Sequence, residues 1–195
     1  MKQLLRLLIG TTLVMTALGT TGLRTLHAET GGGSYTCTGF LVGAVVPGNV
    51  VIPSGSYCII SGATIEGNVI VQPGGKLDIQ RSTVERNVLS QRADGVFVGQ
   101  DQILGNVELK GGTRSTRVLH TSIGGQANLS GNSGTTILDF DTIAKHAHFT
   151  NNTGLRNEVA FNTVAGMLQC ESNTPPPSQV ANVAQRYQGQ CAVGA

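Results

Sequence analysis

The side chains best suited to acid–base chemistry in this 195-residue chain are three aspartates and one arginine. Asp101 and Asp141 occupy the same position two repeats apart, and Asp139 and Arg117 lie nearby in the same pattern. An inverting glycosidase uses two carboxylates about 6.5–9.5 Å apart, and a separation of two coils, about 10 Å, places Asp101 and Asp141 at the wide limit of that range. Because no further acidic residues gather around these four, we treat them as weak catalytic candidates and do not assign an enzyme activity.

Two other groups of side chains have types and spacing that suggest binding. His120, Phe140 and Phe161 recur at one position of consecutive repeats. As an exposed stripe they would hold a sugar ring or a partner's apolar surface, whereas under a covering loop they would only pack together. His146 and His148 form an H-x-H pair without an evident third ligand, so we expect no metal and no cofactor.

These residues sit on a sequence repeat that runs through most of the chain. A T-[VI]-x-G-N-V pattern begins at Thr64 and recurs at Thr83 with Arg86 in place of the glycine. Weaker versions come before and after, and their apolar member advances by 19–21 residues. Aligning the copies gives an apolar column without a polar exception: Val46, Ile65, Val84, Ile103, Ile123, Ile143, Val164 and Val183. A fixed period of this length is typical of a solenoid.

The length of the repeat decides which solenoid is expected. About twenty residues are too few for a helix, a strand and two turns, but they fit three short strands with alternating inward residues. The sequence therefore predicts an all-β, single-stranded parallel β-helix of about eight coils, wound right-handed by the crossover rule. Asparagines of one column are expected to form a structural ladder of stacked amides: Asn49, Asn68, Asn87 and Asn106.

This repeat resembles the right-handed parallel β-helix superfold, the architecture of pectate lyases and of many bacterial surface proteins. The resemblance covers about residues 37–191 and implies a secreted bacterial repeat protein without specifying an activity, since one fold hosts many. Lyases of this architecture use acidic calcium ligands and a basic catalytic residue between long loops. This chain has short loops and no dense aspartate cluster.

The spacing of the four cysteines matches the repeat. Cys37 and Cys58 are one coil apart, and so are Cys170 and Cys191. Neighbouring coils lie about 4.8 Å apart, within the Cα separation of about 4.4–6.8 Å that a disulfide requires. We therefore expect the pairs Cys37–Cys58 and Cys170–Cys191, one at each end of the rod, and a capped monomer.

The first residues have the layout of a secretory signal peptide. A basic start with Lys2 and Arg6 precedes an apolar run, and cleavage is expected after Ala28. We divide the chain into a signal peptide (1–28), a Gly-rich linker (29–36) and the β-helix (37–195). Cleavage removes three of the 13 basic residues, leaving 10 against 11 acidic ones.

That composition sets the functional expectation. A mature chain with a net charge near −1 lacks the basic face that nucleic-acid binding needs, and it has no membrane span once the signal peptide is removed. We expect an extracellular, periplasmic or cell-surface protein that serves as a non-catalytic structural or binding module. The alternative is a small β-helix that binds or cleaves polysaccharide, with cell-surface or extracellular polysaccharide as its partner.

Overall fold

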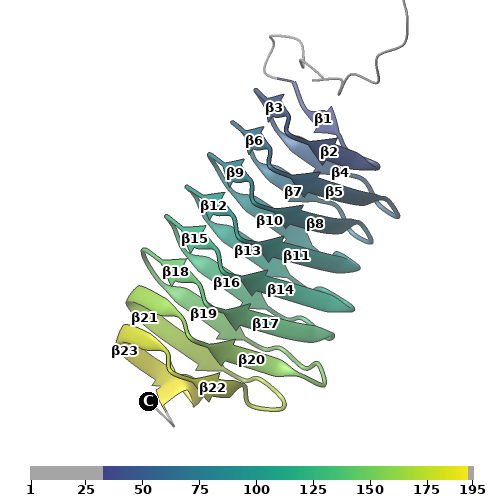
Figure 1. Cartoon of the computed structure of the whole chain (residues 1–195). Coiled ribbons are helices and arrows are strands. Elements are labelled where there is room, and N and C mark those ends of the chain that lie inside the picture. The colour runs from purple at the N-terminus through teal and green to yellow at the C-terminus, as the bar shows by residue number, and fades with distance from the viewer. Residues whose placement is uncertain (1–32, 193–195) are drawn as a thin grey trace, which may run out of the picture.

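The structure, a computed structural model, describes residues 33–192 (Figure 1). The predicted signal peptide and residues 29–32 of the predicted linker lie outside this range. The described chain winds into a parallel β-helix of eight turns, because each strand pairs with the equivalent strand one turn earlier and one turn later. Within residues 33–192 no helix is long and apolar enough to cross a bilayer.

The β-helix has three faces. Sheet B is formed by eight strands: β2 (Phe40–Val42), β5 (Tyr57–Ser61), β8 (Lys76–Gln80), β11 (Gly95–Gly99), β14 (Ser115–Leu119), β17 (Thr135–Asp139), β20 (Asn157–Ala160) and β22 (Ser178–Val180). A second face carries two-residue strands: β3 (Val45–Val46), β6 (Thr64–Ile65), β9 (Thr83–Val84), β12 (Gln102–Ile103), β15 (Ser122–Ile123) and β18 (Thr142–Ile143).

The third face follows a bend after each of these short strands. It consists of β1 (Tyr35–Thr36), β4 (Val50–Ile52), β7 (Val69–Val71), β10 (Val88–Gln91), β13 (Val107–Lys110), β16 (Ala127–Ser130) and β19 (Ala147–Thr150). The second and third faces merge at the C-terminal end, because β21 (Thr163–Glu171) pairs with both β18 and β19, and β23 (Val183–Gly189) pairs with β21. A short 3-10 helix, η1 (Gln190–Ala192), follows β23.

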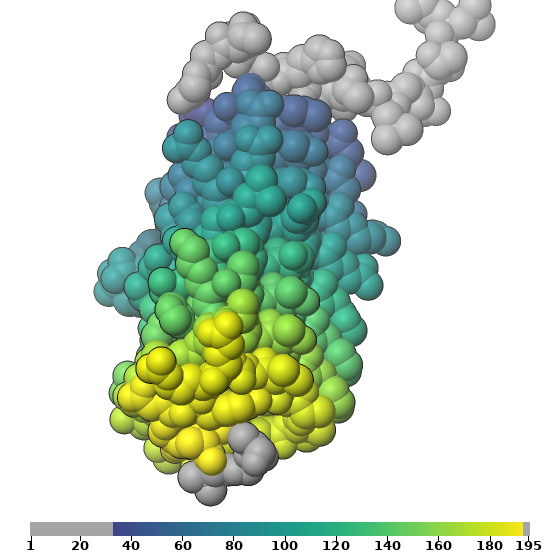
Figure 2. All heavy atoms as spheres, turned by 90° about the vertical axis from the view of Figure 1, so that its left-hand side faces the viewer, coloured from purple at the N-terminus to yellow at the C-terminus, as the bar shows by residue number. Residues whose placement is uncertain are grey.

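The core is a continuous apolar column inside the winding. Side chains alternate inward and outward along each strand, so equivalent inward residues stack from turn to turn. The predicted column is at most 3% exposed from Val46 to Val164. Figure 2 shows the turns following one another in chain order from one end of the rod to the other.

The prediction that Val183 ends this column is wrong. Thr163 pairs with Val183 and Val164 with Ala184, so Val183 points outward and is 63% exposed. Paired residues of the last two turns are 20 positions apart before the register shift between Val164 and Met167 and 19 positions apart after it, so an advance of 19 residues misplaces Val183. For the same reason Asn182, rather than Ala181, continues the position occupied by Asn162.

Both cysteine pairs form disulfides. Cys37–Cys58 joins the first two turns with a Cα–Cα distance of 5.6 Å, and Cys170–Cys191 joins β21 to η1 with a distance of 5.0 Å. All four cysteines are buried in the core cluster. Two disulfides fit an extracellular or otherwise oxidising environment.

Candidate functional site

Asp101 and Asp141 are buried and hydrogen-bond to the backbone. They lie in the bends before β12 and β18 and are 4% and 1% exposed. Asp101 accepts hydrogen bonds from Ser82 N (2.7 Å, Oδ1) and Gly99 N (2.9 Å, Oδ2). Asp141 Oδ1 accepts from Thr121 N at 2.8 Å, whereas its Oδ2 has no partner with hydrogen-bond geometry, although the nearby Asp139 N–H acts to lower the pKa of this carboxyl.

Burial also governs the protonation of these carboxyls. It raises the pKa of Asp101 to about 7, although the backbone N–H groups of Ser82 and Gly99 act to lower it. Burial raises the pKa of Asp141 well above its usual value, with the Thr121 N–H again opposing. Raised carboxyl pKa values are often found at catalytic sites, but a substrate cannot reach carboxyls that are this deeply buried.

Asp139 and Arg117 face outward on sheet B, but in different columns. Arg117 pairs with Ile137, and Asp139 pairs with Leu119. Burial, followed by the charge of Glu158, raises the pKa of Asp139 to about 6. The structure therefore separates the four candidates into two buried aspartates and two outward residues, and the hollow that Arg117 lines contains none of the three aspartates.

His120, Phe140 and Phe161 form an exposed stack at one corner of the rod. Their ring centroids are 4.7 and 4.6 Å apart and the rings are nearly parallel. Phe140 and Phe161 remain 46% and 45% exposed. All three residues have a positive φ, which costs about 1–2 kcal/mol for a non-glycine residue and is partly offset by the stacking. Because the ring faces contact one another, the stack presents mainly ring edges to solvent, and a sugar ring would find a free face only at its ends.

The predicted asparagine column is hydrogen-bonded from turn to turn. Asn68 Nδ2 donates to Asn49 Oδ1 at 3.0 Å, and Asn87 Nδ2 donates to Asn68 Oδ1 at 2.9 Å. Asn106 joins through its backbone N–H, which donates to Asn87 Oδ1 at 2.8 Å. These contacts are intramolecular, so the amides are engaged in holding the turns together.

A second, more deeply buried ladder was not recognised from the sequence. Asn132, Asn152 and Asn173 are at most 3% exposed, and each donates from Nδ2 to the side-chain oxygen of the next member. Gln190 of η1 accepts the last of these bonds. The signal in the sequence is the spacing of 20 and 21 residues between these asparagines, which equals the length of one turn.

His146 and His148 bond to neighbouring residues rather than to each other. Met167 N donates to His146 Nδ1 at 3.0 Å, and His148 Nδ1 lies 2.7 Å from Gln169 Oε1. Residues 33–192 contain no group of three His, Cys, Asp or Glu side chains placed to hold a metal ion.

The outer face of sheet B carries a hollow of about 440 Å³ that the sequence did not indicate. It opens at Gly95, because a glycine in an outward position leaves a gap between its paired neighbours Lys76 and Ser115. On β11 the Phe97 ring leans the other way, over Gly99, where a Cβ would lie 2.6 Å from Phe97 Cζ. The walls are completed by Tyr57, Asp78, Phe97 and Arg117.

Two polar groups of the hollow, Arg117 and Asp78, contact neighbouring side chains. Arg117 Cζ lies 5.9 Å from the centroid of the Phe97 ring, a cation–π contact. Gln80 Nε2 donates to Asp78 Oδ1 at 2.7 Å. Tyr57 is 49% exposed at the edge of the hollow. The hollow thus combines a carboxylate, a guanidinium, hydroxyls and aromatic rings within four turns.

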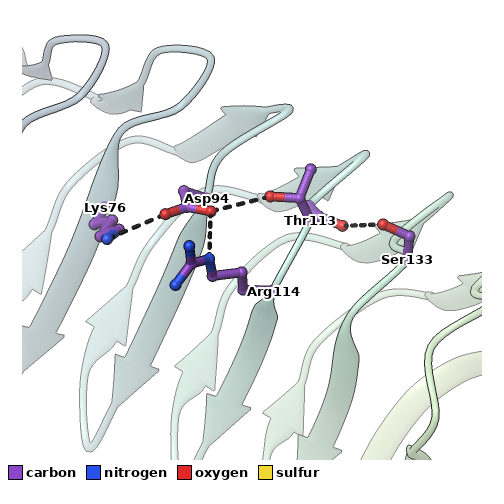
Figure 3. A network of polar contacts seen from close by, with 6 residues as sticks. Lys76, Asp94, Thr113, Arg114 and Ser133 are labelled. Carbon is purple, nitrogen blue, oxygen red and sulfur yellow. Dashed lines mark hydrogen bonds and ion pairs between the residues drawn. The ribbon is translucent and has the colours of Figure 1, made fainter.

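A polar network beside the hollow orients Lys76 (Figure 3). Asp94 lies between Lys76 Nζ (3.1 Å) and Arg114 Nε (3.0 Å), and Thr113 Oγ1 donates to it at 3.2 Å. The hydrogen bond from Lys76, more than any other contact, holds the pKa of Asp94 below its usual value. One turn on, Ser133 Oγ donates to Gly112 O at 3.4 Å. Lys76 is therefore shared between this network and the rim of the hollow.

No protein-family model, curated protein or solved structure matches the chain.

Proposed function

We propose that the protein is an exported, non-catalytic β-helix that binds a saccharide of an extracellular polysaccharide in the hollow at Gly95. The observation that carries the proposal is the composition of this hollow. Saccharides present hydroxyl groups together with apolar C–H surfaces, and binding sites for small ligands combine apolar or aromatic walls with a few fixed polar groups. Tyr57 and Phe97 supply the aromatic surface, and Asp78, Ser115 and Arg117 supply the polar groups.

The non-catalytic part of the proposal is supported by the placement of the aspartates. Asp101 and Asp141 satisfy backbone N–H groups from inside the fold. Asp78 is the only carboxylate among the residues that line the hollow. A polysaccharide chain would lie across this surface without meeting a close pair of carboxylates.

Filling the hollow tests the proposal. The Gly95→Phe variant should keep the fold, because a Cβ at Gly95 meets nothing nearer than Ser115 O at 3.8 Å. The oxidised chain should retain one class of glycan on an array, and Gly95→Phe should reduce that binding at least tenfold. The matched control is Thr135→Phe, which adds the same ring two turns further along the same outward column.

The assay would contradict the proposal in three ways: no glycan is retained, Gly95→Phe binds as well as the unmodified chain, or the polysaccharide is degraded.

A further inference from the structure

Both ends of the rod expose valines at the same two positions. In the first turn Val42 and Val45 are 58% and 56% exposed, and in the last turn Val180 and Val183 are 48% and 63% exposed. Val45 and Val183 are the two ends of one column of paired strand residues. Val42 and Val180 are the two ends of another such column. Between the end valines, the Val45 column consists of polar side chains only: Thr64, Thr83, Gln102, Ser122, Thr142 and Thr163. Valine is therefore confined to the terminal turns of this column.

The terminal strands also have one unpaired edge each. Among residues 33–192, β2 pairs only with β5 and β3 only with β6, while β22 pairs only with β20 and β23 only with β21. Proteins that avoid edge-to-edge association usually place charges or prolines in such strands. Here no charged residue occurs from Thr30 to Ile65, and Arg186 is the only one after Glu171. The prolines of the end turns stand in bends rather than in the strands.

The disulfides hold these edges in the conformation of the interior turns. Cys37 lies three residues before β2, and its partner Cys58 lies in β5, the strand on which β2 pairs. At the other end, Cys191 ties η1, directly after β23, back to β21. A fixed edge loses little conformational freedom when a new strand pairs with it.

From these observations we infer that copies of the chain associate head to tail. The edges of β22 and the start of β23 of one copy pair in parallel with β2 and β3 of the next, so that Val180 lies beside Val42 and Val183 beside Val45. The two surfaces differ, so the contact is heterologous and leaves one free end of each kind. The product is a row of rods rather than a closed dimer. The capped monomer expected from the disulfides then describes only dilute solutions.

Charges placed at one end at a time test this arrangement. Val45→Lys blocks the N-terminal edge and Val183→Lys blocks the C-terminal edge, and both side chains are exposed, so the fold should persist, as circular dichroism would check. Thr83→Lys is the matched control in the middle of the same column. By sedimentation velocity, the unmodified chain and the control should form oligomers that grow with concentration.

Each end variant alone should be monomeric. An equimolar mixture of Val45→Lys and Val183→Lys should form dimers and stop there, because each variant supplies one open edge and both free edges of the resulting dimer carry a lysine. If one end variant still dimerises alone, the contact joins like ends and the inference fails. It fails equally if the unmodified chain stays monomeric at millimolar concentration, as it would if another segment of the same chain covered the valines.

Discussion

At the scale of single residues, Asp101 and Asp141 occupy equivalent positions but differ in what surrounds their second oxygen. Asp101 Oδ2 accepts a hydrogen bond from Gly99 N, whereas Asp141 Oδ2 lies near the equivalent Asp139 N–H without hydrogen-bond geometry. Further along the column, Asn162 and Asn182 use their Nδ2 groups to donate to Leu138 O and Val159 O. An amide is thus the side chain that this position favours toward the C-terminal end.

We predict that Asp141→Asn stabilises the fold. The new Nδ2 would reach the Val118 carbonyl, which stands three residues before the preceding column member, as Leu138 and Val159 do for the two asparagines. Removing a buried oxygen without a partner and adding a donor should raise the free energy of unfolding at neutral pH by about 1–3 kcal/mol. Urea denaturation followed by circular dichroism measures the change, and a loss of stability would contradict it.

The gain should depend on pH in a defined direction. The folded pKa of Asp141 lies above its unfolded value near 3.9, so the fold prefers the protonated carboxyl. That contribution is fully present below about pH 4 and is lost as the pH rises toward the folded pKa. Asp141→Asn should therefore gain little at pH 4 and more at pH 8. Asp101→Asn is the control: one of the two oxygens that accept from Ser82 N and Gly99 N becomes an NH2 group, which faces the N–H as a second donor, so this variant should be less stable than Asp141→Asn at both pH values.

At the scale of elements, the ladders differ in burial and therefore in what they contribute. The Asn152 side chain is fully buried, and its oxygen accepts from both the backbone and side chain of Asn132. Its Nδ2 also donates to Leu129 O. In the exposed ladder, Asn68 makes similar bonds but is only partly buried, so water can replace a missing amide.

Accordingly, Asn152→Ala should cost about 3 kcal/mol or more in the free energy of unfolding, because several buried polar groups lose their partner at once. Asn68→Ala should cost about 1 kcal/mol, as for an ordinary partly exposed hydrogen bond. Chemical denaturation of the two variants under the same conditions gives the comparison. Equal costs would mean that burial does not distinguish the two ladders.

At the scale of the whole molecule, each turn contacts mainly its two neighbours. The free energy of unfolding is therefore nearly a sum of contributions from single turns and from the contacts between adjacent turns. In such a solenoid the end turns have one neighbour and open first. The disulfides sit at these ends, and each joins cysteines 21 residues apart. A bridge closing a loop of this length contributes about 3 kcal/mol in the loop-entropy model.

Replacing Cys170 and Cys191 together by alanine should therefore loosen one end of the rod. Hydrogen exchange should accelerate in β22 and β23 and stay unchanged in β8, β11 and β14. The matched variant, Cys37→Ala with Cys58→Ala, should shift the effect to β1 and β2. A uniform loss of protection along the rod in either variant would show that the turns open as one unit, contrary to this expectation.

The sequence by itself determined the period, and through it the fold class, the core column and the cysteine pairs. A period of about twenty residues leaves few ways to bury one face of each strand. Residues at equivalent positions of the repeat therefore lie above one another in the folded chain. The repeat pattern failed at the last turn, where it assigned Val183 in place of Ala184 to the core column, because a repeat carries no information on where a register shift falls.

Only the tertiary structure decided which polar residues are available to a ligand. The column of Asp101 and Asp141 contains small and polar residues, which suggests bonding to the backbone, but only the fold shows that these aspartates and three asparagines are buried and satisfy polar groups of neighbouring turns. The hollow at Gly95 depends on side chains from four turns and on the direction in which Phe97 leans. Side-chain direction and burial arise from contacts between turns, and such contacts cannot be read from the spacing of residues along the chain.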